Sequence, residues 1–212
     1  MATNPGSSPL VDRVKNILLT PRTEWPRIDA EPATESGIFK SYVMILAAIG
    51  PVAALIGQQL VGYSGYGISY KPTLAFSLGT AIFSYALSLA AIWVLAKIIN
   101  WLAPTFGGTS DSLKALKVAA YAWTPAFLAG IFQLIPALSI LGLAGLYSLY
   151  LLYLGLPVLM KASAEKAVGY TVAVCVGAIL LWLLVGILTV ALVGAVAPTT
   201  PAPGTVTYTV PG

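Results

Sequence analysis

Five long apolar stretches constrain this chain more than any other feature of its sequence. They lie near residues 42–62, 74–97, 113–134, 138–159 and 168–194, and each can supply the roughly 20 residues that a helix needs to cross a bilayer. Every backbone group in hydrocarbon must find a partner inside the protein, and a helix provides one. The connections are short, so sequential helices should pack antiparallel. The sequence therefore predicts an all-α polytopic membrane protein with five transmembrane helices.

The composition points to the same class. Of the 212 residues, 58% are hydrophobic and only 8% are charged, whereas about 25% of a typical soluble domain is charged. A soluble fold of this size could not cover its surface with so few charges. The net charge is +4, but the basic residues are spread between apolar stretches rather than clustered, which argues against a nucleic-acid partner.

The sequence has few of the residues and motifs that catalytic sites, metal sites and disulfides use. The chain has no histidine, and its single cysteine, Cys175, excludes an internal disulfide and a cysteine-based zinc site. No Gly-rich phosphate loop, activated nucleophile or carboxylate pair is present, and Asp111 and Glu165 fall in different connections. We therefore expect no enzymatic activity, no metal and no cofactor.

Lysine and arginine indicate the orientation. Five crossings place ten of the eleven basic residues on one side of the membrane and leave only Lys71 on the other. The ten are Arg13, Lys15, Arg22, Arg27, Lys40, Lys97, Lys114, Lys117, Lys161 and Lys166. We predict a cytoplasmic N-terminus and an extracytoplasmic C-terminus.

The N-terminal segment 1–41 carries an amphipathic helix. In "LVDRVKNILL", apolar side chains up to Leu18 recur at the spacing of one helix face. Thr20 can cap a second turn that starts at Pro21, and Trp25 and Ile28 add further apolar groups. Two interpretations stay open, and they can coexist. The apolar side chains anchor the segment in the cytoplasmic headgroup layer, or they dock a cytosolic partner.

The chain thus divides into the cytoplasmic segment 1–41, a five-helix transmembrane domain 42–194 and a C-terminal tail 195–212. The tail contains "APTTPAPGTVTYTVPG", which has no charge and several prolines and glycines. Such a segment cannot bury a core, so we expect a disordered extracytoplasmic tail.

Two Tyr-x-x-x-Pro patterns, "YAWTP" and "YLGLP", lie inside the third and fourth stretches. Proline lacks an N–H and clashes with the carbonyl four residues earlier, so Pro125 frees the carbonyl of Tyr121, and Pro157 frees that of Tyr153. At about 1.5 Å per residue, both tyrosines lie roughly 9–12 Å deep in one leaflet. Their hydroxyls and freed carbonyls could satisfy one another or hold a water.

Tyr147, Tyr150 and Tyr153 recur at every third residue and share one helix face. The stripe either joins helices through hydrogen bonds or lines a cleft between the third and fourth helices. The candidate intramembrane polar and kink cluster is Tyr121, Pro125, Tyr147, Tyr150, Tyr153 and Pro157. Rows of small residues on the third and fifth stretches, such as Ala122, Ala126 and Gly130, favour close helix packing.

Charged residues are missing from the depth of every stretch. Lys97 lies near a cytoplasmic end, where its ammonium can snorkel to the interface. Gln58, Gln59 and Gln133 lie toward the outer side and suit hydrogen bonding between helices, or a shallow vestibule. Proton-coupled transporters and ion pumps need buried ionisable groups, so this pattern does not favour them.

Three segments together resemble the bacterial branch of the Yip (Ypt-interacting protein) family. They are "ILLTPRTEWPRI", "FGGTSDSLKALKVAAYAWTPAFLAGIF" and "LAGLYSLYLLYLGLPVLMKASAEKAVGYTV", and the resemblance covers about residues 10–194. It implies a five-span protein of the bacterial inner membrane, in agreement with the charge count. Tyr121, Pro125, Tyr147, Tyr153, Gly155 and Pro157 match the family pattern, which carries no catalytic assignment.

Eukaryotic members of this family are associated with Rab-type GTPases, but their long acidic N-terminal region is absent here, so that role is not expected. We expect a non-enzymatic scaffold or regulatory protein that binds membrane partners or lipids. The alternative is a small permease or lipid-moving protein that uses the tyrosine-lined cleft. The expected partners are membrane lipids and either a membrane protein or a second copy of the chain.

Overall fold

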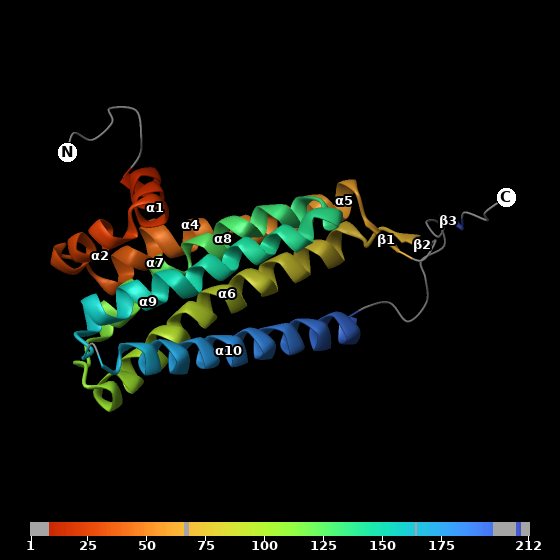
Figure 1. Cartoon of the computed structure of the whole chain (residues 1–212). Helices are drawn as coiled ribbons and strands as arrows, with labels where there is room; N and C mark the ends of the chain where they lie inside the picture. Colours follow the sequence, from red (N-terminus) through yellow and green to blue (C-terminus); the bar gives the residue numbers. More distant parts are fainter. Residues whose placement is uncertain (1–8, 66–67, 164, 197–206, 209–212) are drawn as a thin grey trace.

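Five helical stretches form an elongated bundle (Figure 1). The computed structural model describes residues 9–65, 68–163, 165–196 and 207–208. The stretches that are long and apolar enough to cross a membrane are Glu35–Leu60, Leu74–Phe106, Ser112–Leu134, Ile140–Met160 and Ala167–Thr189. The prediction of an all-α polytopic membrane protein with five transmembrane helices is confirmed.

One end of the bundle, here called the basic end, carries the two N-terminal helices (Figure 1). These are α1 (Pro9–Leu19) and α2 (Pro21–Ala30). The connections 107–111, 161–163 and 165–166 lie at the same end, because they join the second span to the third and the fourth span to the fifth. Most of the basic residues counted in the sequence are therefore gathered here.

A small antiparallel sheet lies at the opposite end, here called the hairpin end (Figure 1). Its strands are β1 (Tyr63–Gly65), β2 (Ile68–Tyr70) and β3 (Thr207–Tyr208). β2 pairs with both β1 and β3, so a piece of the C-terminal segment is joined to the connection between the first two spans. Most of the predicted disordered tail, 195–212, lies outside the described residues.

The first span is helical but not uniform. Its elements are α3 (Glu35–Ile38), the π-helical turn η1 (Phe39–Val43), α4 (Met44–Ala47) and α5 (Ile49–Leu60). The Thr34 hydroxyl caps α3 by accepting a hydrogen bond from the Gly37 N–H at 3.1 Å. The first span therefore begins at Glu35, several residues before the apolar run that starts near residue 42. Its first turns are polar and lie at the basic end.

The second span is the long helix α6 (Leu74–Leu102), which continues as the 3₁₀ turn η2 (Ala103–Phe106). The Thr73 hydroxyl caps its start and accepts from the Phe76 N–H at 3.3 Å. At its end the chain reverses through Gly107, whose φ of +72° lies in the left-handed region that favours glycine. This reversal directs the chain into the third span.

The third span is broken near its middle. Its parts are α7 (Ser112–Ala122), α8 (Thr124–Ala129) and the 3₁₀ turn η3 (Gly130–Leu134). Asp111 caps α7 by accepting from the Lys114 N–H at 3.0 Å. The break falls at Trp123, just ahead of Pro125, because the proline ring displaces the preceding turn and supplies no N–H.

The fourth span begins as a 3₁₀ helix, η4 (Pro136–Leu146), and continues as α9 (Tyr147–Met160). A 3₁₀ run of this length is uncommon, and the apolar run in the sequence does not indicate it. η4 packs against α8 at Gly145, where an added Cβ would lie 3.2 Å from the Cα of Ala126. Pro157 lies within α9 without ending it.

The fifth span is α10 (Ala167–Val196), which packs against α6 and α9. Two of its small residues meet large side chains: Gly169 faces Phe106, and Gly177 faces Ile98. Its remaining face is apolar and exposed, as expected for a helix that meets lipid. These exposed side chains include Val172, Val176, Ile179, Leu183 and Ile187.

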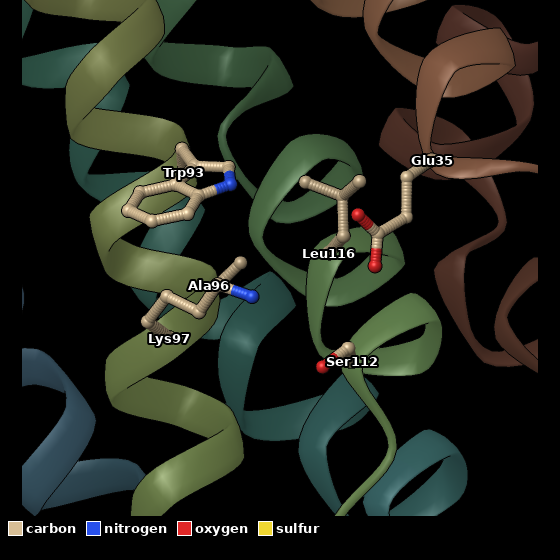
Figure 2. Close-up of a pocket in the computed structure, with 6 residues that line it drawn as sticks. All are labelled: Glu35, Trp93, Ala96, Lys97, Ser112 and Leu116. Carbon is tan, nitrogen blue, oxygen red and sulfur yellow. The ribbon is translucent and has the colours of Figure 1, made fainter.

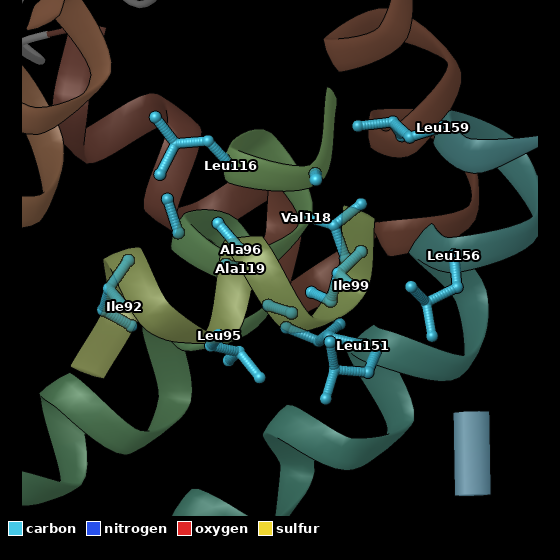
Figure 3. Close-up of a cluster of buried hydrophobic side chains, with 14 of the residues drawn as sticks. Ile92, Leu95, Ala96, Ile99, Leu116, Val118, Ala119, Leu151, Leu156 and Leu159 are labelled. Carbon is cyan, nitrogen blue, oxygen red and sulfur yellow. The ribbon is translucent and has the colours of Figure 1, made fainter. Parts of the chain in front are cut away.

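The core lies where α6, α7 and α9 meet near the basic end (Figure 3). The largest buried side chains of these three helices are Ile92, Leu95, Ile99, Leu116, Leu151, Leu152, Leu156 and Leu159. The same core includes Ile17, Trp25 and Ile28 from the N-terminal helices. The segment 1–41 is thus packed into the bundle through α1 and α2.

Candidate functional site: the docked N-terminal helices

Trp25 fixes α2 to the transmembrane bundle. Its side chain is 0% exposed and lies against Gly155 of α9, where an added Cβ would come within 2.7 Å of the Trp25 Cζ2. Ile28 is buried beside it, and Leu18 of α1 is partly buried against the same core. The predicted membrane-surface anchor, Leu18, Trp25 and Ile28, therefore contacts protein. The prediction that these side chains insert into the headgroup layer is wrong for Trp25 and Ile28, because both are buried in the protein and no lipid can reach them.

The turn between α1 and α2 also differs in one detail from the sequence prediction. Pro21 occupies the start of α2, as expected. The hydroxyl of Thr20 does not cap α2, because it donates back to the carbonyl of Asn16 in α1 at 3.1 Å. The two helices are therefore joined by a tight turn that continues the hydrogen bonding of α1.

A partly buried ion cluster holds α1 to α2. The guanidinium of Arg13 donates one hydrogen bond to Glu24 and another to Glu31, and Glu24 is almost wholly buried. Arg13 also lies over the ring of Tyr121 in α7, 5.5 Å from its centroid. Arg27 adds an exposed pair with Glu31 at 3.2 Å. Because the Arg13 and Glu24 side chains are nearly enclosed, their pairing restricts the angle between the two helices.

Lys117 of α7 caps the C-terminal end of α2. Its ammonium donates to the carbonyl of Ile28 at 2.7 Å and to that of Glu31 at 2.6 Å. The last carbonyls of a helix have no partner inside it and carry a partial negative charge. A lysine that is only 3% exposed thus satisfies the end of a helix that lies 89 residues earlier in the chain.

Asp29 adds a second attachment at the same end of α2. Its carboxylate pairs with Lys114 of α7 at 2.9 Å and with Lys161, which follows α9, at 2.7 Å. Burial alone would raise the pKa of Asp29, but the hydrogen bonds and charges of Lys161 and Lys114 outweigh it and hold the pKa below its ordinary value of 3.8. The carboxylate is therefore ionised at neutral pH, and it links α2 to two spans.

The predicted polar and kink cluster separates into two groups. In the first, the Tyr121 carbonyl near Pro125 accepts from the Thr124 hydroxyl at 2.7 Å, and Thr124 lies 2.6 Å from the hydroxyl of Tyr42. Thr124 has one proton and gives it to Tyr121, so Tyr42 donates to Thr124. The rings of Tyr42 and Tyr121 also meet edge to face, with centroids 4.7 Å apart.

In the second group, Tyr147 donates to the carbonyl of Leu18 at 3.0 Å and so satisfies the end of α1. Tyr150 and Tyr153 are 40% and 45% exposed and face away from the core. The shared pocket expected between Tyr121 and Tyr153 is therefore wrong. The carbonyl of Tyr121 instead accepts a hydrogen bond from the nearby hydroxyl of Thr124.

The third and fourth spans are closely packed where α8 meets η4, so the expected cleft between them does not extend to this contact. The Cα of Ala126 lies so near to Gly145 that even a methyl group would be crowded. A similar approach joins the first and third spans, where a Cβ on Gly130 would lie 2.8 Å from the Cα of Gly50. The small residues noted in the sequence thus serve close packing. Gln59 bonds Ser77 at 2.8 Å, as expected for hydrogen bonding between helices.

The ion network that holds α2 was not predicted from the sequence. Lys114, Lys117 and Lys161 were expected only to indicate the orientation of the chain in the membrane. The available signal was the acidic residues of segment 1–41, including Glu24, Asp29 and Glu31, which balance its basic ones. In this structure those carboxylates are committed to ion pairs.

Comparison with known proteins agrees with this architecture. The family profile described as "Yip1 domain" matches residues 15–197. The chain is 30% identical over 166 residues to the "Inner membrane protein YohC" of Escherichia coli strain K12, a match that covers 76% of this chain and 85% of the relative. The same protein from Escherichia coli O6:H1 matches equally. No solved structure matches the chain.

Proposed function

The chain belongs to the Yip1 domain family, and from that premise we propose that it is a non-enzymatic scaffold or regulatory protein of a bacterial inner membrane. Its similarity to an inner membrane protein supports the location. We place the basic end in the cytoplasm, because lysine and arginine are retained on that side of bacterial membranes. The working surface of this proposal is the outer side of α1 and α2.

The fixed position of α1 and α2 carries the proposal. An amphipathic segment that only adhered to lipid would expose most of its large apolar side chains, whereas Trp25 and Ile28 are buried in the bundle and Leu19 is exposed. Ion pairs and helix-end hydrogen bonds connect the segment to α7 and to the end of α9. A surface held in one geometry binds a partner at a smaller entropic cost than a flexible one.

The outer side of α1 and α2 presents a basic and partly apolar surface. Its exposed residues include Val11, Lys15, Leu19, Arg22 and Arg27. Leu19, at the turn between the helices, is 78% exposed. A complementary partner would offer carboxylates around an apolar contact, so we propose a membrane protein with an acidic segment in the cytoplasm.

Two buried or partly buried carboxylates at this end support the non-enzymatic part of the proposal. Glu24 and Asp29 are paired with arginine or lysine side chains. A general acid or base must reach a substrate and exchange its proton near the working pH. Asp29, with its lowered pKa, is suited instead to a permanent ion pair.

Site-directed photo-crosslinking in cells tests the partner. A photo-reactive residue in place of Arg22 should give a specific protein adduct, and the same residue in place of Lys71, at the hairpin end, should not. The adduct should weaken when Lys117→Met loosens α2. Lipid adducts alone at position 22, or a protein adduct that Lys117→Met leaves unchanged, would contradict a partner surface formed by docked helices.

The orientation has its own test. In a Cys175→Ala background, Lys71→Cys should react with a membrane-impermeant maleimide on intact spheroplasts. Arg22→Cys should react only after the membrane is opened. Labelling of Arg22→Cys from outside would reverse the proposed topology and remove the cytoplasmic partner surface with it.

A further inference from the structure

A small pocket lies beside the docked helices, between the start of the first span, the end of the second and the start of the third (Figure 2). It is lined by Glu35 of α3, Trp93, Ala96 and Lys97 of α6, and Ser112 and Leu116 of α7. None of these residues belongs to the ion network around α2. The pocket is therefore a separate feature of the basic end.

Opposite charges face this pocket from its two sides. Figure 2 shows the ammonium of Lys97 on α6 and the carboxylate of Glu35 on the facing segment, with Leu116 between them. The two side chains are exposed, and among the described residues they form no ion pair with each other or with another group. A cation and an anion separated across a pocket match a ligand that carries both charges.

The remaining lining residues are apolar or hydroxylic. Ala96 and Leu116 are buried and form an apolar wall. The hydroxyl of Ser112 lies at the start of α7 and belongs to the lining (Figure 2). The site therefore offers the Lys97 ammonium and the Ser112 hydroxyl as hydrogen-bond donors and the Glu35 carboxylate as an acceptor.

The position of the pocket along the bundle selects the kind of ligand. Trp93 is 51% exposed, and the ammonium of Lys97 lies over its ring, 5.0 Å from the ring centroid. A tryptophan and a lysine near the end of a transmembrane helix lie where lipid headgroups meet water. The ligand that meets this pocket most often is thus a phospholipid headgroup.

We infer that the headgroup of a zwitterionic phospholipid with a primary ammonium, such as phosphatidylethanolamine, binds across the open side of this small pocket. Lys97 and the Ser112 hydroxyl hold the phosphate, and Glu35 accepts a hydrogen bond from the ammonium. Trp93 lies against the glycerol region. This lipid site goes beyond the proposed partner surface and does not depend on it.

Glu35 gives the pocket its selectivity. An anionic headgroup without an amine, such as phosphatidylglycerol, leaves the carboxylate unpaired beside a negative phosphate. Phosphatidylcholine carries a positive charge but no N–H to donate, and its three methyl groups keep Glu35 at a distance. The order of affinity should therefore be phosphatidylethanolamine first, with the other two well below it.

Native mass spectrometry of the full-length protein in detergent tests this site. Phosphatidylethanolamine, phosphatidylcholine and phosphatidylglycerol of equal chain length are added at equal concentration. We expect one retained phosphatidylethanolamine, preferred about tenfold over each of the others, since a charge-assisted hydrogen bond separates them. Equal retention of phosphatidylethanolamine and phosphatidylcholine, or a preference for phosphatidylglycerol, would overturn the inference.

Two variants separate the two halves of the headgroup. Glu35→Gln should abolish the preference for phosphatidylethanolamine over phosphatidylcholine, and Lys97→Gln should reduce the retention of both. Lys40→Gln changes an exposed lysine of the same end that does not line the pocket, and it should change neither. A preference that survives Glu35→Gln, or displacement of the lipid by equimolar soluble phosphoethanolamine, would contradict a lipid site built on this pair.

Discussion

Trp25 of α2 lies directly against Gly155 of α9, close enough that an added Cβ on residue 155 would meet the indole ring at 2.7 Å. The contact joins segment 1–41 to a transmembrane helix across 130 positions of the chain. Glycine is needed at 155 for space, since the helix there is regular. The indole itself is rigid and enclosed, so it cannot yield to an added methyl group.

Gly155→Ala should therefore move Trp25 and loosen α2. Overpacking of a core contact costs about 1–3 kcal/mol, so we expect a lower thermal midpoint in detergent and a change in tryptophan fluorescence. Gly79→Ala is the matched control, because nothing lies within 4 Å of a Cβ there and alanine favours the helix. A stable Gly155→Ala protein with unchanged fluorescence would contradict the packing described here.

Lys117→Met should release the C-terminal end of α2. Methionine keeps the length of the side chain but leaves the carbonyls of Ile28 and Glu31 without their donor, which costs about 1–3 kcal/mol for buried groups. Trypsin added to inverted membrane vesicles should cut after Arg22 and Arg27 faster than in the parent. Lys15→Met, on the exposed side of α1, is the control and should not speed these cleavages.

The transmembrane spans could be predicted from the sequence because their signal is local. An apolar run of sufficient length must be a helix in hydrocarbon, and Pro125 interrupts its helix through atoms of neighbouring turns. The 3₁₀ form of η4 could not be predicted in this way. The close contact of Gly145 in this helix with Ala126 of another span could not be predicted either, because it leaves no local pattern.

The site was harder to predict for the same reason. The spacing of apolar residues up to Leu18 indicates one apolar face on the first helix, and Trp25 and Ile28 add apolar groups after the turn, but spacing cannot say whether lipid or protein covers them. The partner of Lys117 lies 89 residues away in sequence, so charge counting alone gives its side of the membrane and not its contact.

The attachment of Asp29 makes the docking of α2 depend on pH. Its pKa is held below the ordinary value of 3.8 in the folded protein, so the ion pairs stabilise the fold fully above about that pH and are lost as the pH falls through the lower folded value. Asp29→Asn should remove this component. Its thermal midpoint should be lower than that of the parent at pH 7, and the difference should shrink as the pH falls below 3.8. A difference that stays constant down to pH 2 would show that Lys114 and Lys161 do not set the pKa.

Tyr147 and Tyr153 provide a matched pair of substitutions on one helix. The hydroxyl of Tyr147 donates to the Leu18 carbonyl at the end of α1, whereas the side chain of Tyr153 is 45% exposed. Tyr147→Phe removes one hydrogen bond without changing the ring, so it should destabilise α1 by about 0.5–1.5 kcal/mol. Tyr153→Phe should have almost no effect. Hydrogen exchange of the backbone amides of α1, followed by mass spectrometry, measures this directly, and faster exchange is expected only in Tyr147→Phe. Equal exchange in both variants would mean that the tyrosine stripe does not hold the N-terminal helix.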